Sequence, residues 1–214
     1  MTPLSHRSFA AATALIAGVG LAACTGSSSD LRPAETLTPP ATATVAVDPV
    51  LADLVGPGCA DLVAKVPSGA GSLTQMAALP LATATRRSPV LNTLSAAVSG
   101  KLNPKVKLGQ TLNGGDYTVF APMDAAFAQL PAATMADLRT DGPQLVRVLT
   151  YHLVAGRIAP KQLTGSQKSV QGGDLAITGS GDALKVNGAN VICGGIRTAN
   201  ATVYLIDKVL IPPK

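Results

Sequence analysis

Aromatic side chains are scarce in this chain of 214 residues, which has three Phe, three Tyr and no Trp. Proteins that bind single-stranded nucleic acid stack bases on aromatic platforms, so the composition argues against a nucleic-acid partner. With 47% hydrophobic residues, the core has to be built from Val, Leu, Ile and Ala. The length suits one domain of about 150 residues with appendages.

Side chains that could catalyse a reaction or bind a metal ion are equally few. The chain has two histidines, His6 and His152, and its twelve carboxylates are dispersed. It contains no G-x-S-x-G nucleophile elbow, no G-x-x-x-x-G-K phosphate loop and no clustered Cys/His set. One histidine in the predicted mature protein supplies only one metal ligand. We therefore expect no enzyme activity, no cofactor and no metal site.

Long hydrophobic runs are also missing. The apolar stretch near the N-terminus, from Phe9 to Ala23, has 15 residues, fewer than the roughly 20 that a membrane span requires. It follows Arg7 and ends in L-A-A-C at Cys24, which predicts a secretory signal over 1–23 that ends in a lipobox. The segment resembles bacterial lipoprotein signals. That resemblance implies export, cleavage before Cys24 and a diacylglycerol on its sulfur, so the membrane would be reached through a lipid anchor.

Residues 24–49 are rich in Ser, Thr, Pro and Ala. This composition cannot bury enough apolar surface to order itself, so we interpret the segment as a disordered tether. Twenty-five flexible residues reach on the order of 25–30 Å on average. The tether would hold a folded domain, predicted over 50–214, away from the membrane.

The cysteine count of three is odd for an exported protein. If the lipobox uses Cys24, Cys59 and Cys193 remain, and in an oxidising compartment they most simply form one disulfide. Such a bridge would close a loop of about 135 residues and contribute roughly 4–5 kcal/mol on the chain-entropy model. Two buried free thiols are the alternative.

Positive charge is concentrated in one part of the chain. The formal net charge is +5 and the sequence pI is 9.3. Acidic residues are absent between Leu62 and Gly115, whereas six basic residues lie there: Lys65, Arg86, Arg87, Lys101, Lys105 and Lys107. We interpret this region as a solvated helical face, with contact to anionic envelope polymers or lipid headgroups as the alternative.

Hydrophobic periodicity changes along the chain. From 48 to 100 it is helical, in P-V-L-A-D-L-V, C-A-D-L-V-A-K-V, S-L-T-Q-M-A-A-L and a stretch in which Ser88 and Pro89 resemble a helix start. Another helix is predicted from Pro143 to Tyr151. Beyond Gly156 short strands are separated by glycines, with a hairpin turn at Asn187-Gly188. Helices first and strands later predict an α+β domain.

The segment Y-T-V-F-A-P-M-D-A-A-F, from Tyr117 to Phe127, passes from strand to helix within eleven residues. Alternating apolar residues predict the strand, and Pro122 ends it. Asp124 is predicted as the N-cap of a helix that begins at Ala125, and Phe127 would pack that helix back onto the strand.

Three separated segments resemble the fasciclin domain: T-V-F-A-P-M-D-A-A-F, the pair Tyr151-His152, and the closing run V-Y-L-I-D-K-V-L-I-P from Val203 to Pro212. The match covers roughly 59–213. Met123 departs from the family's usual Thr or Asn. Within the family, G-P-G-C-A, V-I-C-G-G and S-G-K-L-N-P-K-V are similar to the secreted and lipid-anchored fasciclin antigens of mycobacteria.

The resemblance implies one domain in which a β-wedge of short antiparallel strands is flanked by several short helices. It also implies a surface protein in adhesion or in host or envelope interaction, with a host receptor, extracellular matrix or envelope component as partner. An envelope carrier of an apolar ligand, or a structural envelope lipoprotein, is the alternative. We expect a monomer. His152 is interpreted as a structural histidine, and Tyr151 with His152 is the secondary candidate for a recognition surface.

Overall fold

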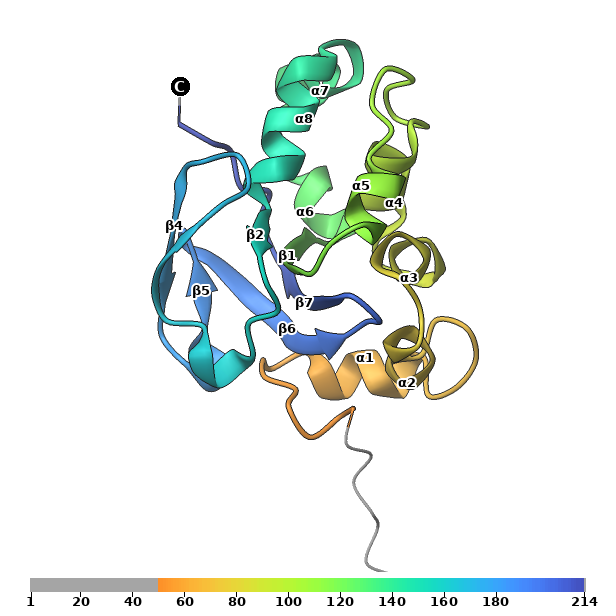
Figure 1. The fold of residues 1–214 in the computed structure, drawn as a ribbon, viewed down its shortest axis with the longest axis vertical. Coiled ribbons are helices and arrows are strands. Elements are labelled where there is room, and N and C mark those ends of the chain that lie inside the picture. The colour runs from red at the N-terminus through yellow and green to blue at the C-terminus, as the bar shows by residue number, and fades with distance from the viewer. Residues whose placement is uncertain (1–49, 214) are drawn as a thin grey trace, which may run out of the picture. The chain divides into compact units, whose positions relative to one another are not determined.

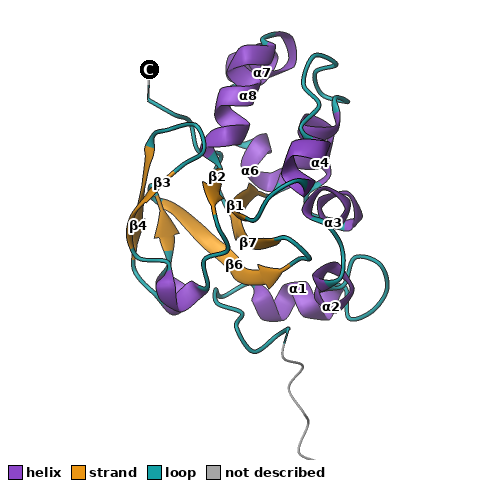
Figure 2. Ribbon diagram, in the orientation of Figure 1, coloured by secondary structure: helices purple, strands orange, loops and turns teal. Residues whose placement is uncertain are grey.

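The computed structural model describes residues 50–213. The predicted signal over 1–23, Cys24 and the tether up to 49 lie outside the described residues, as does Lys214. Within the described part the helices come first and most strands follow (Figures 1 and 2). The predicted α+β fold class is therefore confirmed.

Eight α-helices and two short 3-10 helices form within 50–213. The first five precede the sheet and the next three follow its first strand. Their bounds are α1 Cys59–Lys65, α2 Leu73–Ala77, α3 Leu81–Arg87, α4 Asn92–Ser99, α5 Gly109–Asn113, α6 Asp124–Ala128, α7 Ala132–Thr140, α8 Gly142–Tyr151, η1 Pro160–Gln162 and η2 Gly181–Ala183.

The described strands form one seven-stranded sheet in the order β2-β1-β7-β6-β5-β4-β3. β1 and β7 are parallel, and every other neighbouring pair is antiparallel. The bounds are β1 Tyr117–Pro122, β2 Leu153–Ala155, β3 Gly165–Lys168, β4 Asp174–Thr178, β5 Lys185–Val186, β6 Ala189–Arg197 and β7 Ala201–Ile206.

The β1–β7 pair lies between two hydrophobic clusters. Side chains alternate along a strand, so Val119 faces one cluster and Phe120 the other. The same holds in β7 for Val203 and Tyr204. Because both faces are covered, these strands appear in the sequence as continuous apolar runs. We call the cluster beneath the helices the helical-layer core and the other the wedge core.

The helical-layer core is formed where helices cover one face of the sheet (Figure 1). Leu91, just before α4, and Leu94 and Val98 of α4 are all buried in it. Leu145, Val148 and Leu149 of α8 are buried there as well. Phe127 is 5% exposed and packs in this core beside β1, as predicted.

The wedge core is enclosed by the other end of the sheet. β6 pairs through its first residues with β5 and through the rest with β7, with register shifts between Val191 and Ile196. An isolated antiparallel bridge joins Val154 to Ser169. It brings the end of β3 back to β2, so the sheet curls around the wedge core. The turn at Asn187-Gly188 connects β5 to β6 with positive φ at both residues, as a two-residue hairpin loop requires.

The helix predicted for P-V-L-A-D-L-V is wrong. Residues 50–53 form turns, and Val55 pairs with Gly194 of β6 through backbone hydrogen bonds in both directions. Gly195, with φ of 77°, lies so close to the Asp53 carbonyl that a Cβ atom there would approach its oxygen to 2.2 Å. The segment therefore serves as an extended backbone contact for β6, which the apolar pattern alone does not reveal.

Candidate functional site

Asp124 lies at the turn between β1 and α6, but its carboxylate contacts a different helix. Oδ1 accepts the backbone N–H of Thr93 at 2.7 Å, and Oδ2 accepts the backbone and side-chain N–H groups of Asn92 at 3.2 and 3.0 Å. In return, the Asp124 N–H donates to the carbonyl of Val90 at 3.0 Å. Residues 90–93 and Asp124 thus form a reciprocal capping arrangement between segments about thirty positions apart.

The prediction that Asp124 caps its own helix is wrong. α6 begins at Asp124 itself after Met123, which gives no side-chain cap. α4 begins at Asn92, with Leu91 at the N-cap position, so the start predicted at Ser88 and Pro89 is also wrong. Leu91 has no polar side chain to cap the exposed N–H groups of α4. The carboxylate of Asp124 supplies that function from outside.

The pKa of the Asp124 carboxyl group reflects these contacts. Partial burial raises it, but the hydrogen bonds from Thr93 and Asn92 outweigh burial and lower the pKa below its usual value. The carboxylate form is therefore the one that stabilises the fold.

His152 follows the last residue of α8 and is 3% exposed. Its Nε2 accepts the N–H of Leu210 at 3.0 Å, which places the ring proton on Nδ1, and Nδ1 donates to the carbonyl of Val148 at 2.8 Å. Burial lowers the pKa of His152 to about 4, against an opposing effect of the bond to Val148. The neutral ring thus joins the end of α8 to the C-terminal segment, which agrees with a structural role.

Tyr151 is also 3% exposed. Its hydroxyl donates to the carbonyl of Asp174 at 2.9 Å and accepts from Nδ2 of Asn187 at 2.8 Å. It therefore joins α8 to β4 and to the β5–β6 turn. Because Tyr151 and His152 are both buried, neither side chain forms an exposed recognition surface, and that prediction needs correction. The Tyr-His motif is a pair of internal contacts.

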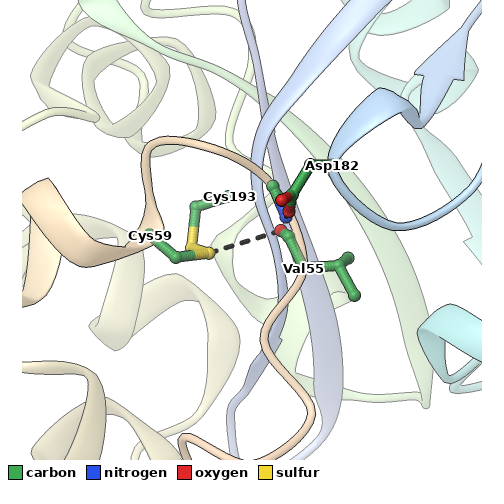
Figure 3. Close-up of a disulfide and its surroundings, with 5 residues drawn as sticks. Val55, Cys59, Asp182 and Cys193 are labelled. Atoms are coloured by element: carbon green, nitrogen blue, oxygen red, sulfur yellow. Dashed lines mark hydrogen bonds between the residues drawn. A yellow bond between two sulfur atoms is a disulfide. The ribbon is translucent and has the colours of Figure 1, made fainter.

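A disulfide joins Cys59 of α1 to Cys193 of β6, with the Cα atoms 4.8 Å apart (Figure 3). This is the predicted pairing, and the alternative of two free thiols does not apply. Sγ of Cys59 lies 3.3 Å from the carbonyl oxygen of Val55. Asp182 accepts the N–H of Gly56 at 3.0 Å. The bridge and these contacts fix the first described segment against the wedge.

Asn200 has an internal role that sequence reasoning missed. Its Oδ1 accepts the N–H of Leu81 at 2.9 Å, and its Nδ2 donates to the carbonyls of Leu112 and Gly115 at 2.8 and 2.7 Å. One amide thus organises the start of α3, the end of α5 and the entry to β1. The sequence shows Asn200 as the first residue of N-A-T, and nothing in that pattern reveals the contacts.

The described residues form two kinds of hollow. An apolar cavity of about 20 Å³ lies in the helical-layer core beside His152. A surface groove of about 510 Å³ lies over α3, α4 and α5, and we call it the basic groove because Arg86 and Lys107 line it together with Ser99, Gln110 and Asn113.

Residues 50–213 contain neither a membrane-spanning helix nor a cluster of metal ligands. No helix there combines the length and hydrophobicity needed to cross a bilayer. In the same part of the chain, no three His, Cys, Asp or Glu side chains gather closely enough to hold a metal ion.

Comparison with known proteins agrees with this architecture. The profile of the Fasciclin domain matches residues 90–212. The chain is 50% identical over 209 residues to the cell surface glycolipoprotein MPT83 of Mycobacterium tuberculosis, covering 95% of this chain and 94% of that protein. It is 52% identical over 171 residues to the immunogenic protein MPB70 of Mycobacterium bovis, covering 79% and 89%.

Among solved structures, a FAS1 domain pair from the insect cell adhesion molecule fasciclin I is similar in fold. Its TM-score is 0.50 at 14% identity, covering 62% of this chain and 50% of that one. The sequence matches and the fold agree with the motifs around Asp124, Tyr151 and the closing strand. The chain belongs to the fasciclin domain family.

Proposed function

We propose that this protein is a lipid-anchored surface protein whose fasciclin domain binds partners outside the cell and catalyses no reaction. The observation that carries the proposal is the extent of the similarity to MPT83. The family profile covers 90–212, but the similarity to this cell surface glycolipoprotein covers 95% of the chain. It therefore includes most of the N-terminal region in which the lipobox lies.

The absence of catalysis is proposed on chemical grounds. His152 is the only histidine in the predicted mature chain, and both of its ring nitrogens are engaged with backbone groups. A buried, neutral ring with both nitrogens occupied has no position from which to move a substrate proton. Adhesion, or contact with a host or envelope component, requires only a stable domain that presents a surface.

The apolar cavity in the helical-layer core is too small for the carrier alternative. A site for an apolar ligand needs a cavity of about 300 Å³ or more. The apolar cavity beside His152 has about 20 Å³, close to the volume that one water occupies. A fatty ligand would have to separate α3 and α4 from β1 to enter.

Labelling with a radioactive fatty acid tests the anchor. In a mycobacterial host, the full chain should incorporate label and partition into detergent, and Cys24→Ala should abolish both. The neighbouring substitution Thr25→Ala is the matched control and should leave labelling unchanged. Protease treatment of intact cells should then remove the wild-type domain from the surface. A labelled protein that stays protected in intact cells would contradict the surface role, and an unlabelled wild-type chain would contradict the anchor.

A further inference from the structure

The excess of basic over acidic side chains in the described domain comes from one part of the chain. Between residues 50 and 213 there are fourteen basic and nine acidic side chains, and six of the basic but none of the acidic lie between 62 and 115. The remainder has eight basic and nine acidic side chains and is therefore nearly neutral. All six basic side chains are exposed. The layer that contains α3, α4 and α5 thus carries the excess charge.

The basic groove is the concave part of this layer. Arg86 of α3 and Lys107, just before α5, line it with the polar side chains of Gln110 and Asn113, and no acidic residue lines it. Figure 1 shows α3, α4 and α5 together on the side of the domain away from β4. A volume of about 510 Å³ is within the range of sites that hold small molecules or short segments of a polymer.

Neither cation of the groove forms an ion pair with another described residue. Ion pairs between described residues involve Lys168 with Asp174 and Arg197 with Asp53, and neither Arg86 nor Lys107 takes part in one. Arg86 donates a single bond, to the Thr83 hydroxyl, so most of its five N–H donors remain free. These cations are thus available to an anionic ligand.

Small residues give the groove its depth and hold Lys107 in place. Ala82 and Gly109 lie in its lining, and a Cβ at Gly109 would lie 4.0 Å from that of Ala82. Gly100 ends α4 with φ of 85°. A Cβ there would lie 3.2 Å from Cγ of Lys107. The stem of Lys107 therefore packs on the backbone at Gly100.

The surroundings of the groove favour a polysaccharide over a bilayer. Peripheral membrane binding combines basic residues with apolar side chains that enter the interface. The large hydrophobic side chains that are exposed in 50–213 are Val170 and Ile211, and both lie outside this layer. A concave groove also admits a chain but not a flat lipid surface. No aromatic side chain lines it, so recognition would depend on charge.

We propose that the basic groove binds a sulfated or carboxylated polysaccharide through Arg86 and Lys107, with Gln110 and Asn113 as neutral hydrogen-bonding groups. This inference rests on the proposed function, because it supplies the class of partner for the exported domain. The anionic groups of the polymer would enter between α3 and α5. Lys101, Lys105 and Arg87, which are exposed nearby in sequence, would raise the local concentration of the polymer without fixing its register.

The test is a binding titration with the full chain carrying Cys24→Ser, against a heparin octasaccharide, an alginate octasaccharide and neutral dextran. We expect binding to one or both acidic oligosaccharides and none to dextran.

The double variant Arg86→Gln/Lys107→Gln should bind about tenfold more weakly at low salt, and the slope of log K against log salt should fall by about two. The matched control Arg139→Gln/Lys161→Gln removes two exposed charges elsewhere and should change affinity less than twofold.

A variant that fills the groove distinguishes binding within the groove from general electrostatic attraction. Gly109→Leu keeps every cation but fills the space next to Ala82, and it should weaken binding as much as the charge variant does. Unchanged circular dichroism and melting temperature would show that each variant folds.

Three results would overturn the proposal: an equal loss in the control pair, full affinity in Gly109→Leu, or tighter binding to vesicles containing 30% phosphatidylglycerol or to polyglutamate than to either acidic oligosaccharide. None of these results bears on fatty-acid labelling or surface exposure, so failure of the groove and failure of the proposed function are distinguishable.

Discussion

The helical layer and the β-wedge are built by different means. In the wedge, strands that follow each other in the sequence are joined by short turns, as at Asn187-Gly188 between β5 and β6. In the helical layer, two helix starts depend on distant side chains: Asp124 caps α4, and Asn200 accepts the N–H of Leu81 at the start of α3. The part of that layer between 62 and 115 also carries six basic and no acidic side chains.

The comparison suggests a division of roles. The wedge is held by internal contacts, and its buried Tyr151 and Tyr204 are both bonded to backbone carbonyls. It serves as a scaffold. The helical layer presents the six cations of 62–115 and the basic groove, and its position relative to the sheet depends on a few polar contacts and on the disulfide from α1 to β6. Substitutions at those contacts should therefore affect the stability of the two regions differently.

The largest effect is expected from loss of the disulfide. The double variant Cys59→Ser/Cys193→Ser should lower the free energy of unfolding by about 4 kcal/mol, because the bridge spans 134 positions and restricts the unfolded chain. Denaturant titration with and without reductant measures this. Reductant should destabilise the wild type by a similar amount and leave the double variant unchanged. If the wild type keeps its midpoint in reductant, the α1–β6 connection does not support the fold.

The next effect concerns pH and His152. Its pKa is about 4 in the folded protein, below the unfolded value of 6.5, so its contribution is fully present above pH 6.5. Stability should fall by about 3 kcal/mol as the pH drops from 6.5 to 4, because the unfolded chain takes up the proton first. Urea titrations across this range measure how the free energy of unfolding changes with pH.

His152→Gln can still accept from Leu210 and donate to Val148 without titrating, so the loss of stability over this pH range should largely disappear. An unchanged slope in that variant would assign the pH dependence to other groups.

In the helical layer, Asp124→Ala should cost about 2 kcal/mol, since α4 loses the acceptor for its first N–H groups. The lowered pKa of Asp124 means that this contribution is present above the unfolded pKa and is lost as the pH falls through the folded one. Thermal and urea unfolding at pH 7 measure the cost. Asp137→Ala removes a carboxylate that is exposed in α7; it is the control and should stay within about 0.5 kcal/mol. Equal effects of the two substitutions would exclude the capping role.

The smallest effect is expected in the wedge. Tyr151→Phe removes the hydroxyl between Asp174 and Asn187 and should cost about 1 kcal/mol, because each partner loses one hydrogen bond. Tyr117→Phe is the matched control, since the Tyr117 ring packs beside Gly115 without a hydrogen bond from its hydroxyl among the described residues. Urea titration compares the two. A larger loss in Tyr117→Phe would show that the Tyr151 bonds do not hold α8 to the wedge.

The sequence predicts those features that depend on neighbours in the chain. The strand that ends at Pro122, the helix from Pro143 to Tyr151 and the hairpin turn at Asn187-Gly188 are local patterns, and all three agree with the structure. The motifs also identify the family, and cysteine counting gives the disulfide.

Apart from the disulfide, the sequence does not predict contacts between distant segments. Asp124 resembles a local N-cap because its neighbours fit that pattern, yet the acceptor for α4 lies about thirty positions away from that helix. His152 is predicted as a structural histidine, but its partner Leu210, 58 positions away, is not predicted. The secondary prediction of a recognition surface at Tyr151 and His152 fails because both side chains are buried once α8 packs against the sheet. The basic residues of 62–115 are visible in the sequence, but the groove appears only when α3 and α5 lie side by side.

The most direct test of the account is to map the binding face by NMR. Amide shifts of the full chain carrying Cys24→Ser would be followed during titration with whichever acidic octasaccharide binds. The account predicts that the largest changes fall at Arg86, Lys107 and Gln110, with little change along β3 and β4. Changes concentrated on the β3–β4 hairpin, with α3 and α5 unaffected, would contradict it.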